Sequence, residues 1–291
     1  MTQRSTSIGY LLVVIGIAIW LIVERGQSML NLFNEIKLWP LLIIVVASIL
    51  PFFANIAFWT IALRELGETV TWKQVTEASA ETTLTRYLPG GVWLAASRSV
   101  ALARKGVRTP ALVALIGLEM ALGTPVAILV GTLFLSGSES APLWLVWIAG
   151  GAILILATVG RPLLNTVLAW WTKRRNQPAP TPLKALALIR LVGILSVYWI
   201  AFGTIFWGYL FAMNSELSWL TATGAFALSW RIGLFAVFAP QGLGIFEPAL
   251  LALVGWSTDA LLLVGAFRMV LLIRDLIVTT ITIATKRNNF S

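Results

Sequence analysis

Residues 186–213 read LALIRLVGILSVYWIAFGTIFWGYLFAM, an apolar run whose one charged residue, Arg190, lies near its start. A transmembrane α-helix needs about 20 consecutive apolar residues, so this run is long enough to cross a bilayer. Arg190 is close enough to the end of the run for its side chain to reach the lipid head groups. Further runs of this kind cover Ile8–Val23, Trp39–Leu63, Ala111–Leu135, Leu143–Val159, Leu217–Ala239 and Ala260–Ala284, and a shorter one covers Ile245–Trp256.

The composition agrees with these runs. Hydrophobic residues make up 58% of the 291 residues and charged residues only 11%, whereas a soluble domain carries about 25% charged residues. We therefore predict an all-α integral membrane protein with roughly 6–8 transmembrane helices, forming a single membrane domain over residues 1–291. The chain contains no cysteine and no histidine, which excludes disulfides, Cys/His zinc sites and imidazole bases. We expect no metal and no cofactor.

The basic residues are distributed unevenly between the loops. With the N-terminus inside, the inner loops hold most of the lysines and arginines, while the outer ones hold only Arg25 and Lys37. The positive-inside tendency then predicts a multi-pass protein of the cell membrane with both termini in the cytoplasm. It also explains the net charge of +9 through contacts with anionic lipids rather than nucleic acid. Residues 173–182 form the one linker-like stretch and separate possible halves 1–172 and 183–291.

Two polar stretches interrupt the pattern of plain spans. In the first, Glu77–Leu94, the carboxylates of Glu77 and Glu81 share a helical face, and Arg86 follows one turn later. Pro89, Gly90 and Gly91 then break the helix. The stretch is either an amphipathic surface helix with a turn or a re-entrant hairpin, because broken backbone at membrane depth is tolerated only against protein or water.

The second stretch, Arg231–Pro248, repeats this order: a basic residue, an apolar step, Pro-x-Gly, and a short apolar helix. Aligning Pro89 with Pro240 also pairs Gly91 with Gly242. The apolar runs that follow the two breaks are expected to cross in opposite directions. This is the pattern of an inverted repeat, whose broken helices surround the substrate site in many transporters.

Charged residues also lie inside the apolar runs. Each costs at least about 2.5 kcal/mol at the centre of a lipid-facing helix, so these side chains are expected to face the protein interior and to pair. Arg268 and Asp275 are seven residues apart and share one helical face. Either the charges form structural ion pairs or, as a set around two Pro-Gly breaks, they line a polar cavity. The residues are Glu119, Arg231, Arg268, Arg274 and Asp275.

These motifs resemble a known family. The segment RYLPGG at 86–91, the turn Arg104–Gly106, Glu119 and the segment PQGLGIFE at 240–247 are similar to the lysylphosphatidylglycerol synthase transmembrane region, and the resemblance covers essentially the whole chain. The second motif reads Pro-Gln-Gly where the family more often has Pro-Gly-Gly. Family members include the membrane half of a lipid synthase and flippase, and stand-alone proteins suspected of moving lipids or lipid-linked sugars. The synthase activity resides in a soluble domain that we expect this chain to lack, so the resemblance implies the translocating half.

We therefore expect a lipid flippase that binds an anionic head group in a polar cavity within the membrane, and not an enzyme. Arginines would bind phosphate oxygens in bidentate fashion, and backbone N–H groups freed at the two breaks would add donors. The carboxylates would balance the arginines or bind a cationic head group. The predicted substrate-binding residues are Glu81, Arg86, Pro89, Gly90, Gly91, Arg98, Glu119, Arg231, Pro240, Gly242, Gly244, Glu247, Arg268, Arg274 and Asp275.

Other functions stay open at this point. One is an integral membrane transferase, whose lone carboxylates would act as bases. Another is a non-catalytic partner of a glycosyltransferase, docked through the loop Lys173–Lys184, and a weaker one is an ion or solute transporter. The sequence has no Gly-x-x-x-x-Gly-Lys-Ser/Thr motif, so direct use of ATP is not expected. The partners expected in every case are membrane lipids.

Overall fold

The computed structural model describes residues 38–88, 92–136, 143–234, 240–256 and 260–288. The chain divides into two compact units, residues 1–42 and 43–291. Most of the first unit, including the predicted run Ile8–Val23, lies outside the described residues, and so do residues 235–239 at the end of the predicted run Leu217–Ala239. The fold and the site described below belong to the second unit.

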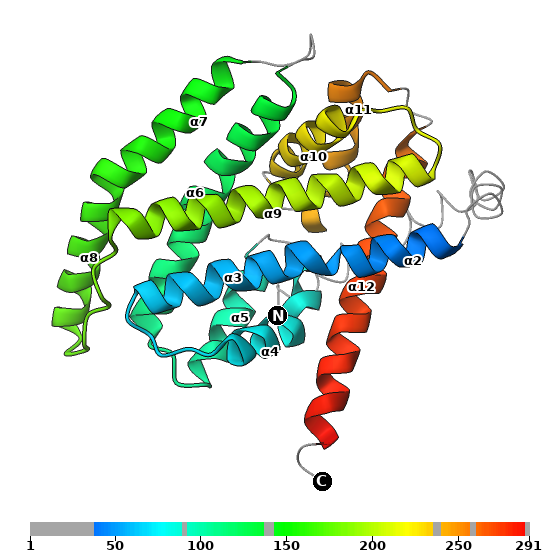
Figure 1. Cartoon of the computed structure of the whole chain (residues 1–291). Coiled ribbons are helices and arrows are strands. Elements are labelled where there is room, and N and C mark those ends of the chain that lie inside the picture. The colour runs from blue at the N-terminus through cyan, green and yellow to red at the C-terminus, as the bar shows by residue number, and fades with distance from the viewer. Residues whose placement is uncertain (1–37, 89–91, 137–142, 235–239, 257–259, 289–291) are drawn as a thin grey trace, which may run out of the picture. The chain divides into compact units, whose positions relative to one another are not determined.

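Helices dominate the described residues, and four helical segments are long and apolar enough to cross a membrane. The prediction of an all-α multi-pass membrane protein is confirmed. Figure 1 shows α3 and α9 side by side, and these two helices pack along their length. The four segments are Trp39–Glu65, made of α2 (Leu38–Ala47) and α3 (Ile49–Glu65), α6 (Thr109–Phe134), Trp144–Arg174, and α9 (Ala185–Ala212).

The segment Trp144–Arg174 is longer than the predicted run Leu143–Val159. It consists of α7 (Trp144–Ile155), the π-helical turn η2 (Leu156–Gly160) and α8 (Arg161–Arg174). Beyond α8, the linker-like loop is attached to the protein at several points. Leu183 bonds the Asn165 side chain through both its N–H and its carbonyl, and the Thr181 N–H donates to the Leu66 carbonyl at 2.9 Å. This loop is exposed for much of its length but is held against the helices.

The first polar stretch forms α4 (Trp72–Thr82), the 3₁₀ turn η1 (Thr83–Tyr87) and α5 (Trp93–Ala103). A capping box starts α4: the Thr71 hydroxyl accepts from the Gln74 N–H, and the Gln74 side chain accepts from the Thr71 N–H. One face of α4 is buried against its neighbours, and Thr279 of α12 (Leu261–Asn288) donates to the Ala80 carbonyl at 3.0 Å. This packing between long helices favours the hairpin over an amphipathic helix on the surface. Its depth in the membrane stays a prediction.

The second polar stretch forms α10 (Trp219–Leu234), the short turn η3 (Pro240–Gly242) and α11 (Phe246–Val254). Both stretches therefore contain a helix, a break and a short helix in the predicted order, while the inverted repeat itself stays a prediction. Aromatic rings from α9 to α12 pack together beneath this break, with ring centroids 5.1–5.9 Å apart. This aromatic cluster packs next to the second break. The rings belong to Phe202, Phe206, Phe226, Phe246 and Phe267.

The backbone of the second break passes close to α10 at Gly242. Gln241 (φ 49°), Gly242 (φ 72°) and Gly244 (φ 82°) adopt left-handed conformations. A Cβ atom added to Gly242 would overlap the backbone of Gly233 in α10. Glycine is therefore required at position 242 both for its dihedral angles and for this close approach.

We expect Gly242→Ala to lower the free energy of unfolding by roughly 3 kcal/mol, because it combines a left-handed alanine with an overpacked contact. Thermal unfolding of the detergent-solubilised protein measures the effect. Gly244→Ala is the matched control: it has the same backbone strain, but its Cβ meets no atom within 4 Å, and its cost should be only about 1 kcal/mol. Equal losses in the two variants would contradict the close contact between Gly242 and Gly233.

Candidate functional site

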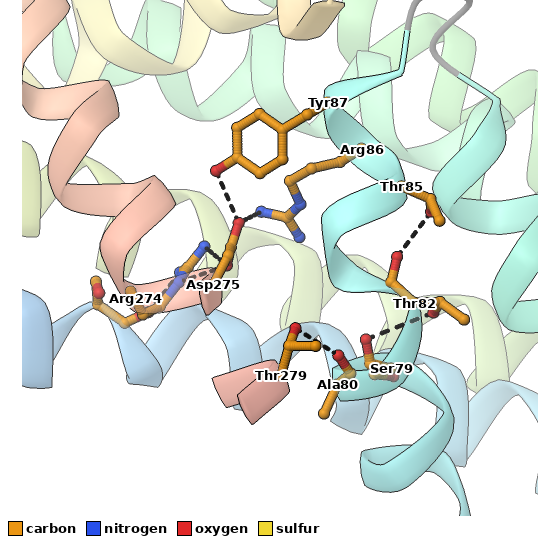
Figure 2. Close-up of polar contacts among 10 residues, drawn as sticks. Ser79, Ala80, Thr82, Thr85, Arg86, Tyr87, Arg274, Asp275 and Thr279 are labelled. Carbon is orange, nitrogen blue, oxygen red and sulfur yellow. Dashed lines mark hydrogen bonds and ion pairs between the residues drawn. The ribbon is translucent and has the colours of Figure 1, made fainter. Parts of the chain in front are cut away.

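Asp275 of α12 lies at the centre of a buried polar cluster between α12 and η1 (Figure 2). Its Oδ1 accepts from Arg274 Nε at 2.8 Å, and its Oδ2 accepts from the Tyr87 hydroxyl at 3.0 Å. Arg274 Nη1 also donates to the Ser48 carbonyl at 2.8 Å. Asp275 and Ser48 are completely buried, and Arg274 is only 2% exposed. The cluster thus ties the first polar stretch to α12.

Arg86 joins this cluster more loosely. Its Nη1 lies 3.5 Å from Asp275 Oδ2, beyond the length of a strong charge-assisted hydrogen bond. Figure 2 shows the Arg86 and Tyr87 side chains reaching from η1 toward the same carboxylate. Asp275 is therefore neutralised mainly by Arg274. Arg86 is thus the more weakly held of the two arginines at this carboxylate.

A second buried pair joins α12 to α11. Arg268 Nε lies 2.6 Å from Glu247 Oε1, and Arg268 Nη1 donates to the Gln241 carbonyl at 3.1 Å. Glu247 Oε2 accepts from the Gly244 N–H at 2.8 Å. The first-turn carboxylate of α11 therefore occupies the Gly244 N–H, while donation to a ligand by the other backbone N–H groups at the two breaks stays a prediction. This pair is a structural support of the second break.

A third set connects Arg98 to Glu119 through an amide. Arg98 Nη1 donates to Asn55 Oδ1 at 2.6 Å, and Asn55 Nδ2 donates to Glu119 Oε1 at 3.0 Å. This orientation of the Asn55 amide is required chemically, since arginine only donates and a carboxylate only accepts. The Arg98 guanidinium also lies 4.5 Å from the centroid of the Trp59 ring. Asn55 was not predicted, although a polar amide in an apolar run is itself a signal of an interior contact.

Arg231 is half-buried and differs from the buried arginines Arg98, Arg268 and Arg274. Its guanidinium packs over the Trp199 ring at 5.0 Å and against the backbone of Gly123 in α6. No carboxylate of a described residue forms an ion pair with it. The carboxylate of Glu119 acts on its charge only at longer range.

Glu119 and Tyr198 are shared by three arginines from three elements. Both lie within electrostatic range of Arg86 of η1, Arg98 of α5 and Arg231 of α10; Glu119 contributes a negative charge, and Tyr198, a neutral phenol at neutral pH, contributes a polar hydroxyl. We call these five residues the arginine site. Tyr198 was not predicted, because a tyrosine within an apolar run is more often an interfacial anchor or a core residue.

The other residues predicted to bind substrate belong to the two polar stretches. Pro89, Gly90 and Gly91 lie outside the described residues. Pro240 begins η3, and Glu81 is half-buried in α4. If all are ionised, the predicted set carries five positive charges and four negative ones, an excess that favours an anionic ligand. The positive residues are Arg86, Arg98, Arg231, Arg268 and Arg274, and the negative ones are Glu81, Glu119, Glu247 and Asp275.

The segment that matches a known protein family contains both polar stretches and all residues of the site. The family model described as the lysylphosphatidylglycerol synthase TM region matches residues 7–278. The chain belongs to this family. The resemblance seen in the motifs is thereby confirmed, and membership places the chain among membrane proteins related to lipid handling. No curated protein matches the sequence.

Proposed function

We propose that this member of the lysylphosphatidylglycerol synthase TM family translocates a phosphate-bearing lipid, with the head group bound at the arginine site. The observation that supports this most is Arg231, a half-buried guanidinium of the membrane domain that forms no ion pair with a carboxylate of the described residues. An unpaired charge in such an environment is costly and marks a functional position. A phosphate group supplies the missing negative charge.

The ion pairs divide the arginines into two groups. Arg268 and Arg274 each hold a carboxylate at 2.8 Å or less and also bond a backbone carbonyl, so their charges are used by the fold. None of Arg86, Arg98 and Arg231 has a carboxylate of a described residue within 2.8 Å: the nearest to Arg86 is 3.5 Å away, Arg98 bonds an amide, and Arg231 packs on a ring. Guanidinium groups bind phosphate oxygens through pairs of parallel hydrogen bonds. The second group therefore forms the head-group site, and the lipid tails stay in the bilayer.

The loose contact of Arg86 permits binding and release. When a phosphate draws Arg86 away, Asp275 keeps its bonds to Arg274 and Tyr87. No buried carboxylate is left unpaired, so the exchange avoids the main cost of breaking a buried ion pair. When the lipid leaves, Arg86 returns to Asp275.

The unequal distribution of basic residues supports a multi-pass arrangement in the cell membrane with both termini cytoplasmic. Membrane lipids are then the direct partners. A lipid-modifying enzyme such as a glycosyltransferase would supply or consume the translocated lipid.

The test is translocation in liposomes that contain the purified chain, fluorescent phospholipids and a membrane-impermeant quencher. Anionic, zwitterionic and lysyl-linked lipids are compared, and mass spectrometry follows their chemical integrity. We expect quenching beyond the outer-leaflet fraction for at least the anionic lipid, with no change in its mass. Quenching equal to that of protein-free liposomes for every lipid would overturn the proposal. Chemical turnover of a lipid would instead indicate a transferase.

A further inference from the structure

The arginine site carries more positive charge than its own carboxylate balances. Its three arginines supply three positive charges and Glu119 supplies one negative charge, so two positive charges remain if all are ionised. Tyr198 is a neutral phenol at neutral pH and does not change this count. Residues 89–91 and 235–239, at the two breaks, lie outside the described residues, and their sequence contains no charged residue.

The neighbouring charges leave this excess unchanged. Asp275 also acts on Arg86, but Arg274 binds the same carboxylate at 2.7 Å, and this pair contributes one charge of each sign. Among the described residues, the carboxylates that act on the three arginines are those of Glu119 and Asp275; Glu81 of α4 is not one of them. The excess of two positive charges is therefore the same with or without the Asp275 cluster.

The same residues carry buried hydrogen-bond donors that no acceptor of the described residues uses. The Nε atom of each of the three arginines is buried and has no partner there, and the indole N–H groups of Trp59 and Trp199 have none either. Each indole packs against one of these arginines, Arg98 or Arg231, and is at most 1% exposed. A buried donor without an acceptor is costly, so the site favours a ligand rich in acceptor oxygens.

Two kinds of phosphate group differ in the charge and the oxygens that they offer to such a site. A phosphodiester carries one negative charge and has two non-bridging oxygens. A phosphomonoester has three terminal oxygens and carries about −1.5 to −2 charges at pH 7, because its second pKa is about 6. The monoester can thus offer one oxygen to each arginine, and its dianion balances the excess of two positive charges.

We propose that the arginine site selects lipids whose head group is a phosphomonoester. This inference rests on the proposed function, because it concerns the head group held at the same site and names its chemical class. Phosphatidic acid and polyprenyl phosphates both present such a group on an apolar chain. A lipid with a phosphodiester leaves one positive charge unbalanced and binds more weakly.

Selection of a dianion makes binding depend on pH. The groups that titrate around the site are the carboxylates of Glu119 on α6 and Asp275 on α12 and the phenols of Tyr87 on η1 and Tyr198 on α9. The chain has no histidine and no cysteine, the side chains whose ordinary pKa lies nearest to neutral pH. Protonation between about pH 8 and pH 5 therefore falls on the phosphomonoester, which becomes a monoanion and loses its advantage over a phosphodiester.

The experiment measures binding by calorimetry with the purified full chain in detergent. The ligands are short-chain phosphatidic acid, farnesyl phosphate as a polyprenyl phosphate, and short-chain phosphatidylglycerol. We expect the monoesters to bind at least about tenfold more tightly than phosphatidylglycerol at about pH 8, and the ratio to fall to about two or less at about pH 5. A preference for only one of the two monoesters supports the proposal and identifies the lipid. Equal affinities for monoester and diester at the higher pH, or no binding of any of these lipids, would overturn it.

Three variants locate the selectivity and the proton. Arg231→Gln lowers the excess charge to one, so the ratio at the higher pH should fall to about threefold or less. Lys173→Gln is the matched control, because it removes an exposed charge in the last turn of α8, and the ratio should not change. In Glu119→Gln the dependence on pH should persist. Its loss in that variant would assign the proton to the protein and contradict the proposal.

Translocation of the same lipids in liposomes separates this inference from the proposed function. Selective binding without translocation supports the phosphomonoester and contradicts transport. Translocation at equal rates for monoester and diester lipids, together with equal affinities, keeps transport and overturns the selectivity.

Discussion

Replacing Asp275 by asparagine should lower the free energy of unfolding by about 3 kcal/mol or more. The substitution keeps the size of the side chain but removes the charge that neutralises Arg274, and both residues are buried. It also removes the carboxylate beside Arg86. A buried guanidinium without its counter-ion is far more costly than the absence of the whole pair. Thermal or SDS-induced unfolding of the purified protein, in matched detergent, measures this loss.

Two comparisons make this expectation specific. Arg274→Met added to Asp275→Asn should restore a large part of the stability, because the unpaired charge is removed as well. Glu65→Gln breaks the ion pair with Arg190, a side chain that is 56% exposed. That control should cost at most about 1 kcal/mol. A similar loss for Asp275→Asn and Glu65→Gln would contradict the structural role assigned to Asp275.

The apolar runs could be predicted from sequence because bilayer thickness sets a minimum length for each span. The predicted Ala111–Leu135 and Leu186–Met213 agree with α6 and α9 to within two residues at each end. The end of the helix that contains residue 159 could not be predicted, because Arg161 and Pro162 read as a helix terminus. The π-helical turn η2 instead carries the helix past this proline, through a local change in the hydrogen-bond pattern.

The interior charges of the site could be predicted, but their partners could not. A spacing of seven residues places Arg268 and Asp275 on one face, yet each pairs elsewhere, because two helical turns separate them by about 10 Å. Glu247 reaches Arg268 from α11, while Asp275 pairs with its own neighbour and with Arg86. Pairs between separate elements depend on packing that periodicity does not contain. Asn55 is uncharged, so its position in a span carries a smaller penalty than that of an ionised side chain and gives a weaker signal of an interior role.

Arg231→Gln should reduce lipid translocation at least about tenfold, because it removes a charge-assisted contact to phosphate at a half-buried position. The same substitution should leave stability unchanged or slightly higher, since no carboxylate of the described residues depends on this guanidinium. Loss of function without loss of stability is the opposite of the result expected for Asp275→Asn. Liposome translocation and thermal unfolding, measured on the same preparation, test both parts.

A second variant tests the position of Arg231 without changing its charge. A methyl group at Gly123 would occupy the place of the Arg231 guanidinium, whereas one at Gly117 of the same helix meets no atom within 4 Å. Gly123→Ala should therefore slow translocation several-fold by displacing the guanidinium, while Gly117→Ala should not, and both should fold. Normal transport in Arg231→Gln and in Gly123→Ala would show that the head group passes elsewhere. In that case the unpaired arginine would be a structural feature of α10, and the arginine site would no longer describe the lipid path.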